Sequence, residues 1–254
     1  MMRKNLVLVA TMCTLLFAFV VGEVYGADLA LGKRVFQSRC AFCHGQKGDG
    51  NGYADFVYKT NEKGKIWKLY PRDFTQGVFR FRSTSTGSLP TDEDLIRLVK
   101  VGIPRSSMPP TRDLSDAERK AVVDYIKTLS KRWKDEGQGT AIEIGKKPEW
   151  VGSPESVEKG AQVWKDMKCW ECHGEKGRGD GTKSDELKDD QKKAILPFDF
   201  TIGALKRGTT DEDIYLAYTT GLDGSGMPSY EDSLDNEKRW HLVSYTKKLM
   251  GKIK

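Results

Sequence analysis

Two short cysteine–histidine motifs contain the residues of this chain that are best suited to chemistry. The sequence reads CAFCH at positions 40–44 and CWECH at positions 169–173. Two thiols three positions apart on one turn can form thioethers with the two vinyl groups of a haem, and the histidine that follows can reach the iron. Each motif therefore predicts one covalently attached haem c, so two iron centres are expected. The predicted tethers are Cys40, Cys43, Cys169 and Cys172, and the predicted proximal ligands are His44 and His173.

The cysteine content disfavours the main alternatives to haem. Of the five cysteines, Cys13 lies in an apolar N-terminal segment and the other four belong to the two motifs, so none is left for a structural disulfide. A structural zinc site needs four protein ligands in one place, whereas these pairs lie in opposite halves of the chain. A thioredoxin-like dithiol requires a strand followed by a helix, and the sequence around the motifs shows no strand pattern.

Two methionines are candidates for the sixth iron ligand. Met108 and Met227 each precede a proline, which holds the preceding residue in extended backbone and stiffens the loop. Such a loop can keep a thioether in place while an iron changes charge. Met167 and Met250 lack this setting, and the alternative role for any methionine is to fill a gap in a core. Histidine–methionine ligation raises the reduction potential and fills both axial positions, which favours an electron carrier over a catalyst.

The third histidine of the chain lies outside both motifs. His241 falls on the apolar side of the last predicted helix, at the position where the first half of the chain has Ala121. We interpret it as a packed or interface histidine. A role as an alternative iron ligand in one redox state stays open.

Four sequence blocks recur in the same order, which indicates a tandem duplication. The first copies occupy 40–52, 71–75, 91–110 and 121–129, and the second occupy 169–181, 197–201, 210–229 and 241–249. The predicted organisation is a signal peptide at 1–26, a first unit at 27–134, a linker at 135–151 and a second unit at 152–254. The linker is rich in glycine, proline and charge, with one short extended piece, IEI, that could cross a unit.

The N-terminal segment predicts export from the cytoplasm. Arg3 and Lys4 precede an apolar run over 6–22, and small residues flank a cut between Gly26 and Ala27, as in a secretory signal peptide. Left uncleaved, a run of this length is at the lower limit of a membrane anchor. The predicted location is the periplasm, with no membrane span once the signal is removed.

The net charge says little about partners. The formal charge of +6 arises from basic and acidic residues interspersed along the chain, as on an ordinary solvated surface, so we expect no nucleic-acid partner. The four propionates of two haems would offset most of this excess.

Both units are predicted to be helical, which makes the fold class all-α. Thr91 and Thr210 are expected to cap helices with acidic first turns, since anions are favourable at a helix N-terminus. Ser115 and Glu118 form a capping-box pattern before an apolar stripe of helical period. A first helix should lead from Asp28 into the first motif, and no convincing alternating strand is present in either unit.

Other residues have candidate roles beside the haems. Pro71 and Pro197 are candidates to present a backbone carbonyl to the proximal histidine. Residues 58–68 and 80–88, which lengthen the first unit, could form a docking surface or a haem cover. Basic residues that could pair with propionates, or be plain surface charge, are Arg80, Arg82, Lys206 and Arg207. Tryptophans that could shield the second haem, or pack in its core, are Trp164, Trp170 and Trp240.

These residues together resemble the class I cytochromes c. The resemblance rests on the motif near the start of each unit, the later Met-Pro pair and a closing helix with an aromatic, and it extends over the whole mature chain as a two-domain dihaem form. It implies three or more helices around each haem. It also implies the axial pairs His44/Met108 and His173/Met227. Similar dihaem cytochromes often accompany periplasmic respiratory oxidoreductases, including molybdenum enzymes.

The functional hypothesis is single-electron transfer between periplasmic redox partners, as a free shuttle or as a bound subunit, without catalysis. The alternative is a dihaem enzyme such as a peroxidase or a thiosulfate dehydrogenase. Those activities need one iron with an open, labile or unusual ligand.

Overall fold

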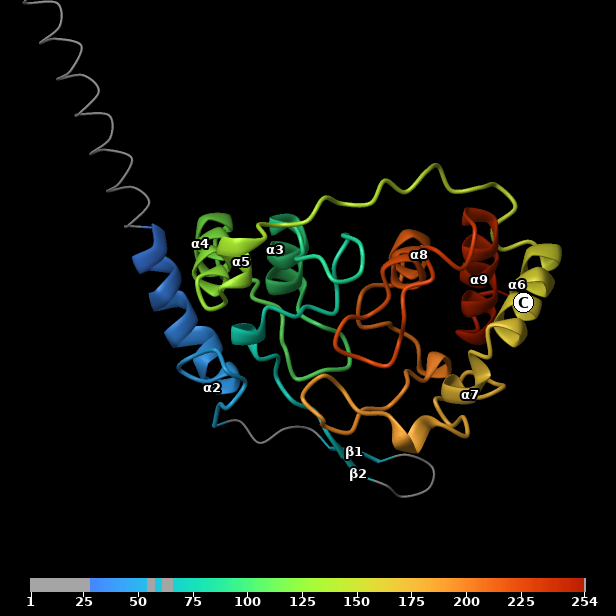
Figure 1. The fold of residues 1–254 in the computed structure, drawn as a ribbon, viewed down its shortest axis with the longest axis horizontal. Coiled ribbons are helices and arrows are strands. Elements are labelled where there is room, and N and C mark those ends of the chain that lie inside the picture. Colours follow the sequence, from blue (N-terminus) through green and yellow to red (C-terminus); the bar gives the residue numbers. More distant parts are fainter. Residues whose placement is uncertain (1–27, 54–57, 61–65, 254) are drawn as a thin grey trace, which may run out of the picture.

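The computed structural model describes residues 28–53, 58–60 and 66–253, and the predicted signal peptide therefore lies outside the described residues. Two helical units lie side by side, and the chain crosses from one to the other along the edge of the molecule (Figure 1). The predicted all-α class is confirmed. The helices enclose two separate hydrophobic cores, and each unit contains one of the two cysteine pairs.

The first unit begins with helical residues 28–35, which continue without a break into a short π-helical segment. Its elements are η1 (Phe36–Cys40), α2 (Ala41–His44), β1 (Tyr58–Thr60), β2 (Ile66–Lys68), η2 (Phe74–Gln76), α3 (Asp92–Val101), α4 (Asp116–Lys127) and α5 (Arg132–Asp135). Strands β1 and β2 pair antiparallel as a small hairpin, which the sequence did not predict. Strands of three residues are too short to show an alternating pattern.

The second unit repeats the same order of helices. Its elements are α6 (Pro154–Asp166), α7 (Trp170–His173), η3 (Ser184–Glu186), η4 (Phe200–Ile202), α8 (Asp211–Thr220) and α9 (Asn236–Leu249). The predicted caps are confirmed. Thr91 and Thr210 form capping boxes with Asp94 and Asp213, and Ser115 forms one with Glu118.

The first helix of each unit crosses a later long helix, α4 or α9, at a glycine. Gly32 lies against the backbone carbonyl of Ala121, and Gly160 lies against that of His241, so closely that a Cβ atom at either glycine would overlap the carbonyl. The two crossings are equivalent in the repeat. Each one closes a core, the first around Phe36 and the second around Leu242.

The linker is packed along both units. Ile142 donates to the carbonyl of Ser83 at 2.8 Å, as expected for an extended piece that crosses one unit. Farther on, the ring of Trp150 packs on that of His241, with ring centres 4.3 Å apart. The Gly152 amide then donates to Ser244 Oγ, which secures the end of the linker to α9.

Arginines of the first unit connect it to the second. Arg82 is fully buried and lies 2.8 Å both from the carboxylate of Asp223 and from the carbonyl of Thr220. In the other direction, Arg207 donates to the carbonyl of Arg82 at 2.6 Å. Further ion pairs join Arg72 to Asp190, Arg80 to Asp189 and Arg97 to Asp213. Segment 80–88 therefore lies against the second unit.

These contacts change the interpretation of the basic residues. Arg80 and Arg82, which were predicted as partners for propionates or as plain surface charge, pair with carboxylates of the second unit.

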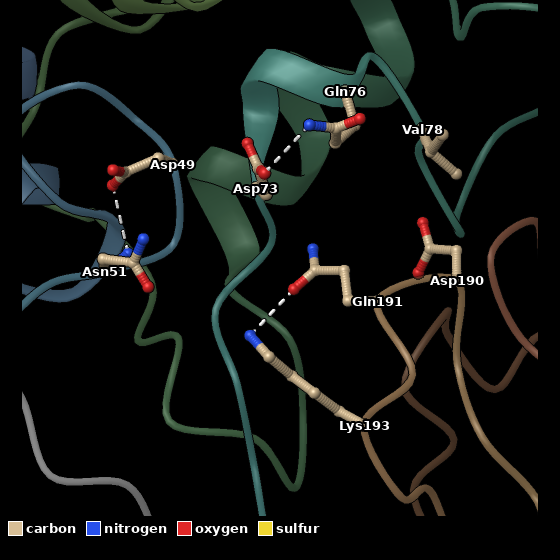
Figure 2. Close-up of a pocket in the computed structure, with 8 residues that line it drawn as sticks. All are labelled: Asp49, Asn51, Asp73, Gln76, Val78, Asp190, Gln191 and Lys193. Carbon is tan, nitrogen blue, oxygen red and sulfur yellow. Dashed lines mark hydrogen bonds between the residues drawn. The ribbon is translucent and has the colours of Figure 1, made fainter.

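Beside the Arg72–Asp190 pair, both units line a polar hollow of about 430 Å³ (Figure 2). Asp73 and Gln76 face it from one unit, and Lys193 faces it from the other.

Candidate haem sites

Each cysteine pair lies on a short helical turn that ends at its histidine. The first pair spans the junction of η1 and α2, and the second consists of Cys169, the N-cap of α7, and Cys172 within α7. In α7 the His173 amide donates to the carbonyl of Cys169 at 3.0 Å, so the turn places both thiols and the imidazole close together. All four thiols are free and half-buried, as thioether formation requires.

The thiols lack the electrostatics of a redox dithiol. Burial raises the pKa of Cys40 and of Cys169 to about 11, and it also raises the pKa of Cys172. Reactive dithiols depend on a lowered thiol pKa. Burial thus keeps Cys40, Cys169 and Cys172 neutral and sheltered, as the haem interpretation expects.

Both motif histidines are held by one ring nitrogen. His44 Nδ1 donates to the carbonyl of Arg72 at 3.0 Å, and His173 Nδ1 donates to that of Phe198 at 3.1 Å. Because a carbonyl only accepts, the proton is on Nδ1 and the lone pair is on Nε2, the state that binds a metal. Burial also lowers the pKa of each imidazole, which keeps both rings neutral.

The carbonyl prediction was wrong by one position. Pro71 and Pro197 were expected to accept from the histidines, whereas the acceptors belong to the residues that follow them. The proline carbonyls instead lie beside Gly50 and Gly179. These glycines belong to the glycine loops, the glycine-rich stretches 45–52 and 174–181 that follow the two motifs. Successive carbonyls of an extended segment point in opposite directions, so a one-residue error exchanges the two roles.

The sequence DFT occurs at 73–75 and again at 199–201. This repeated DFT block positions a ring against each histidine, a role that the sequence analysis missed. Asp73 caps η2 by accepting from the amide of Thr75 at 2.8 Å. Phe74 then stacks on His44 with ring centres 4.4 Å apart, and Phe200 packs on His173 at 4.9 Å. The recurrence of DFT in both units was the signal that could have identified these residues.

The glycine loops fold back over the motifs. The amide of Gly50 donates to the carbonyl of His44, and that of Gly179 donates to the carbonyl of His173, both at 2.8 Å. Gly50 has a φ of 76° and Gly179 one of 75°, a conformation that favours glycine. The loops also bind the DFT blocks, since the Phe74 amide donates to the carbonyl of Gly48 at 2.7 Å.

The two Met-Pro loops have the same backbone structure. The carbonyl of Met108 accepts from Ile103, and that of Met227 accepts from Leu222, each at 3.1 Å. Gly102 precedes the first loop with a φ of 70°. Both methionines are partly buried in the core of their own unit. The loops are thus matched, and ligation of iron by Met108 and Met227 stays a prediction.

A buried arginine braces the first Met-Pro loop. Arg119 Nη1 donates to the carbonyl of Thr111 at 2.8 Å and also bonds to the carbonyl of Leu114. Its counterpart in the repeat is Arg239, which lies over the ring of Tyr215 at 5.3 Å. Sequence reasoning did not single out either arginine, because a basic residue in a charged helix resembles surface charge.

His241 is packed between helices. It is 5% exposed, its Nδ1 lies 2.9 Å from Ser156 Oγ of α6, and its Nε2 lies 3.3 Å from Glu237. These contacts agree with the prediction of a packed histidine.

Two of the tryptophans that were considered as haem shields differ in their surroundings. Trp164 packs near the ring of His173, with ring centres 5.7 Å apart, whereas Trp240 stacks on Tyr215 in the core.

The residues of each unit fit a haem c. Two sheltered thiols can attach the vinyl groups of such a group, and an imidazole with its Nε2 lone pair free can bind its iron. The Met-Pro loop offers a thioether as the candidate second ligand. By contrast, no cluster of three or more metal-binding side chains of the His, Cys, Asp and Glu type occurs among the described residues. Within the same residues, no helix is both long and apolar enough to cross a membrane.

Comparisons with known proteins agree with this fit. Residues 27–126 match the family model described as "Cytochrome C oxidase, cbb3-type, subunit III", and residues 157–250 match the one described as "Cytochrome c". A solved structure from the reducing HAO-like protein complex of Kuenenia stuttgartiensis is similar, with 36% identity and a TM-score of 0.79. The similarity covers 86% of this chain and 95% of that one. No curated protein matches significantly.

Proposed function

Because this chain belongs to the c-type cytochromes and contains two cytochrome c domains in tandem, we propose that it carries single electrons between redox partners. When bound, haem c supplies an iron that changes between the ferric and ferrous states without making or breaking a bond. The observation that carries the proposal is the matched hydrogen bond from each histidine Nδ1 to a backbone carbonyl. It leaves Nε2 of His44 and His173 free for iron in both units.

The proposed axial pairs are His44 with Met108 and His173 with Met227. The histidines are fixed by a backbone carbonyl and a stacked phenylalanine. The methionines lie on loops that a following proline and a carbonyl hydrogen bond hold in place. Two fixed ligands keep the same geometry in both oxidation states, which lowers the reorganisation needed for each electron transfer. Filled axial positions also support a carrier rather than an enzyme.

The proposed setting is the periplasm, as part of an assembly or in exchange with one. Cytochromes of this type are generally found outside the cytoplasm, and the sequence predicts an export signal. The relative of known structure belongs to an HAO-like protein complex, which supports a redox-protein partner for this chain. Size-exclusion chromatography of native extracts, followed at the haem absorption band, separates a free shuttle from a bound subunit.

Replacement of the methionines tests the ligand assignment. Met108→Ala and Met227→Ala should each abolish the methionine signature in the spectrum of one haem and lower the reduction potential of that haem alone. Met167→Ala is the matched control, because Met167 also contacts the second core but has no following proline. Unchanged spectra in both test variants would overturn the assignment. Peroxidase turnover by the purified wild-type protein would favour the enzyme alternative.

A further inference from the structure

Three equivalent positions of the repeat have different side chains in the two units, and at two of them an apolar residue of the first unit is replaced by a hydroxyl-bearing one. The first unit has Val99, Thr111 and Ile126, and the second has Tyr218, Tyr230 and Thr246. The backbone confirms the correspondence, since the amide of Thr111 donates to the carbonyl of Val99, and that of Tyr230 donates to the carbonyl of Tyr218. The same framework thus presents different side chains beside the Met-Pro loop.

The second unit contains a buried hydroxyl pair at these positions. Tyr218 Oη and Thr246 Oγ1 are 2.6 Å apart, and the two residues are 4% and 0% exposed. Tyr230 packs against Tyr218 with ring centres 6.4 Å apart, and Tyr230, Cys169 and Met227 all pack against the hydrophobic core that contains Tyr218. The hydroxyl pair therefore joins α8 to α9 inside the core that also contacts a predicted haem tether and Met227.

The first unit is apolar at the same place. Val99 and Ile126 are buried in the hydrophobic cluster that also contacts Cys40 and Met108. The hydroxyl of Thr111 donates to the carbonyl of Val99 at 2.8 Å, so it is occupied by the backbone. No hydroxyl pair corresponds to Tyr218 and Thr246 among these residues.

This difference should separate the two reduction potentials. A ferric centre carries one more positive charge than a ferrous one, and an apolar shell disfavours the more charged state, whereas buried hydroxyl groups favour it. Given the proposed function, we propose that Tyr218 and Thr246, with Tyr230, set the potential of the second haem below that of the first. With both haems bound, an electron would then be favoured on the haem held by the first unit, and its transfer from the second unit would involve no proton.

Near-isosteric removal of the hydroxyl pair tests the proposal. The double variant Tyr218→Phe/Thr246→Val deletes both partners and keeps the shape, so no buried group is left without a partner. In the wild type the two haems should differ by about tenfold or more in the one-electron equilibrium constant, which is about 59 mV. In the variant, spectroelectrochemical titration should show that the lower potential rises while the upper potential stays unchanged. The rise should correspond to a change of about threefold to tenfold in the one-electron equilibrium constant between the haems.

A hydroxyl elsewhere on the same helix provides the control. Tyr215→Phe removes a buried hydroxyl that bonds to Asn236, and it should leave both potentials unchanged. Equal potentials in the wild type, movement of the upper potential, or an equal shift in the control would each overturn the proposal. Haem content distinguishes this result from failure of the proposed function. Fewer than two haems per chain refutes the dihaem carrier itself, whereas two reversible haems of equal potential refute only the tuning.

Discussion

Replacement of Asp223 by asparagine should weaken the contact between the two units. Asp223 binds the fully buried guanidinium of Arg82 at 2.8 Å, and it also accepts from Thr86 Oγ1 and from the amide of Gly87, both at 2.8 Å. The variant keeps one amide oxygen as an acceptor and loses the negative charge. Arg82 then keeps the carbonyl of Thr220 but loses the carboxylate that pairs directly with its buried charge.

The expected loss follows from the burial of the arginine. Removal of one partner from a buried ion pair costs about 3–5 kcal/mol. Because Arg82 retains a carbonyl and Asp223 is 19% exposed, we expect the lower end, about 3 kcal/mol. Urea slopes for small proteins are about 1–3 kcal/mol per molar, so the unfolding midpoint should fall by about 1 M or more.

Urea unfolding followed by both circular dichroism and haem absorbance measures this loss. Asp113→Asn is the matched control, since Asp113 pairs with Arg39 while both side chains are more than half exposed, and such pairs contribute about 1 kcal/mol or less. If the Asp223→Asn midpoint falls no further than that of the control, the buried pair does not stabilise the interface and the reasoning fails.

Three further changes test individual contacts. Arg119→Met should release the backbone carbonyls behind the Met108 loop and weaken the methionine signature of one haem, measured by absorbance in the near infrared. Gly160→Ala should lower the melting temperature strongly because its methyl overlaps a carbonyl of α9, whereas Gly145→Ala, with open space around it, should not. Asp235 caps α9 and its pKa is lowered mainly by that backbone hydrogen bond, so its stabilisation is present above the ordinary value of 3.8 and is lost as pH falls below it. Asp235→Ala should cost about 1 kcal/mol at neutral pH and flatten this acid dependence in thermal melts.

The haem motifs, the repeat and the helix caps could be predicted because each is encoded by residues close together in sequence. A capping box such as Thr91 with Asp94 involves one turn, and its energetics are local. The Met-Pro loops were found for the same reason. Comparison of the two copies then singled out Met108 and Met227 as the candidate ligands.

The contact between the units could not be predicted, because it joins residues far apart in the chain. Arg82 is one of 42 basic residues, and nothing local distinguishes it from a solvated side chain. Its burial depends on Asp223 and on a carbonyl at the end of α8. The carbonyl that accepts from His44 was predicted at Pro71 and lies one residue later, at Arg72. Neighbouring carbonyls of an extended segment point in opposite directions, so a one-residue error selects the wrong one.

Duplication explains why differences between the units are more informative than their shared features. Both copies have the carbonyl that accepts from the motif histidine, the phenylalanine packed on that histidine and the Met-Pro loop. Because these features are matched, none of them can give an electron a preferred direction. A direction requires an unmatched residue near an otherwise equivalent centre. The hydroxyl pair of Tyr218 and Thr246 in place of Val99 and Ile126 is such a difference, and it lies in a core where no solvent would mask its effect on the charge of the iron.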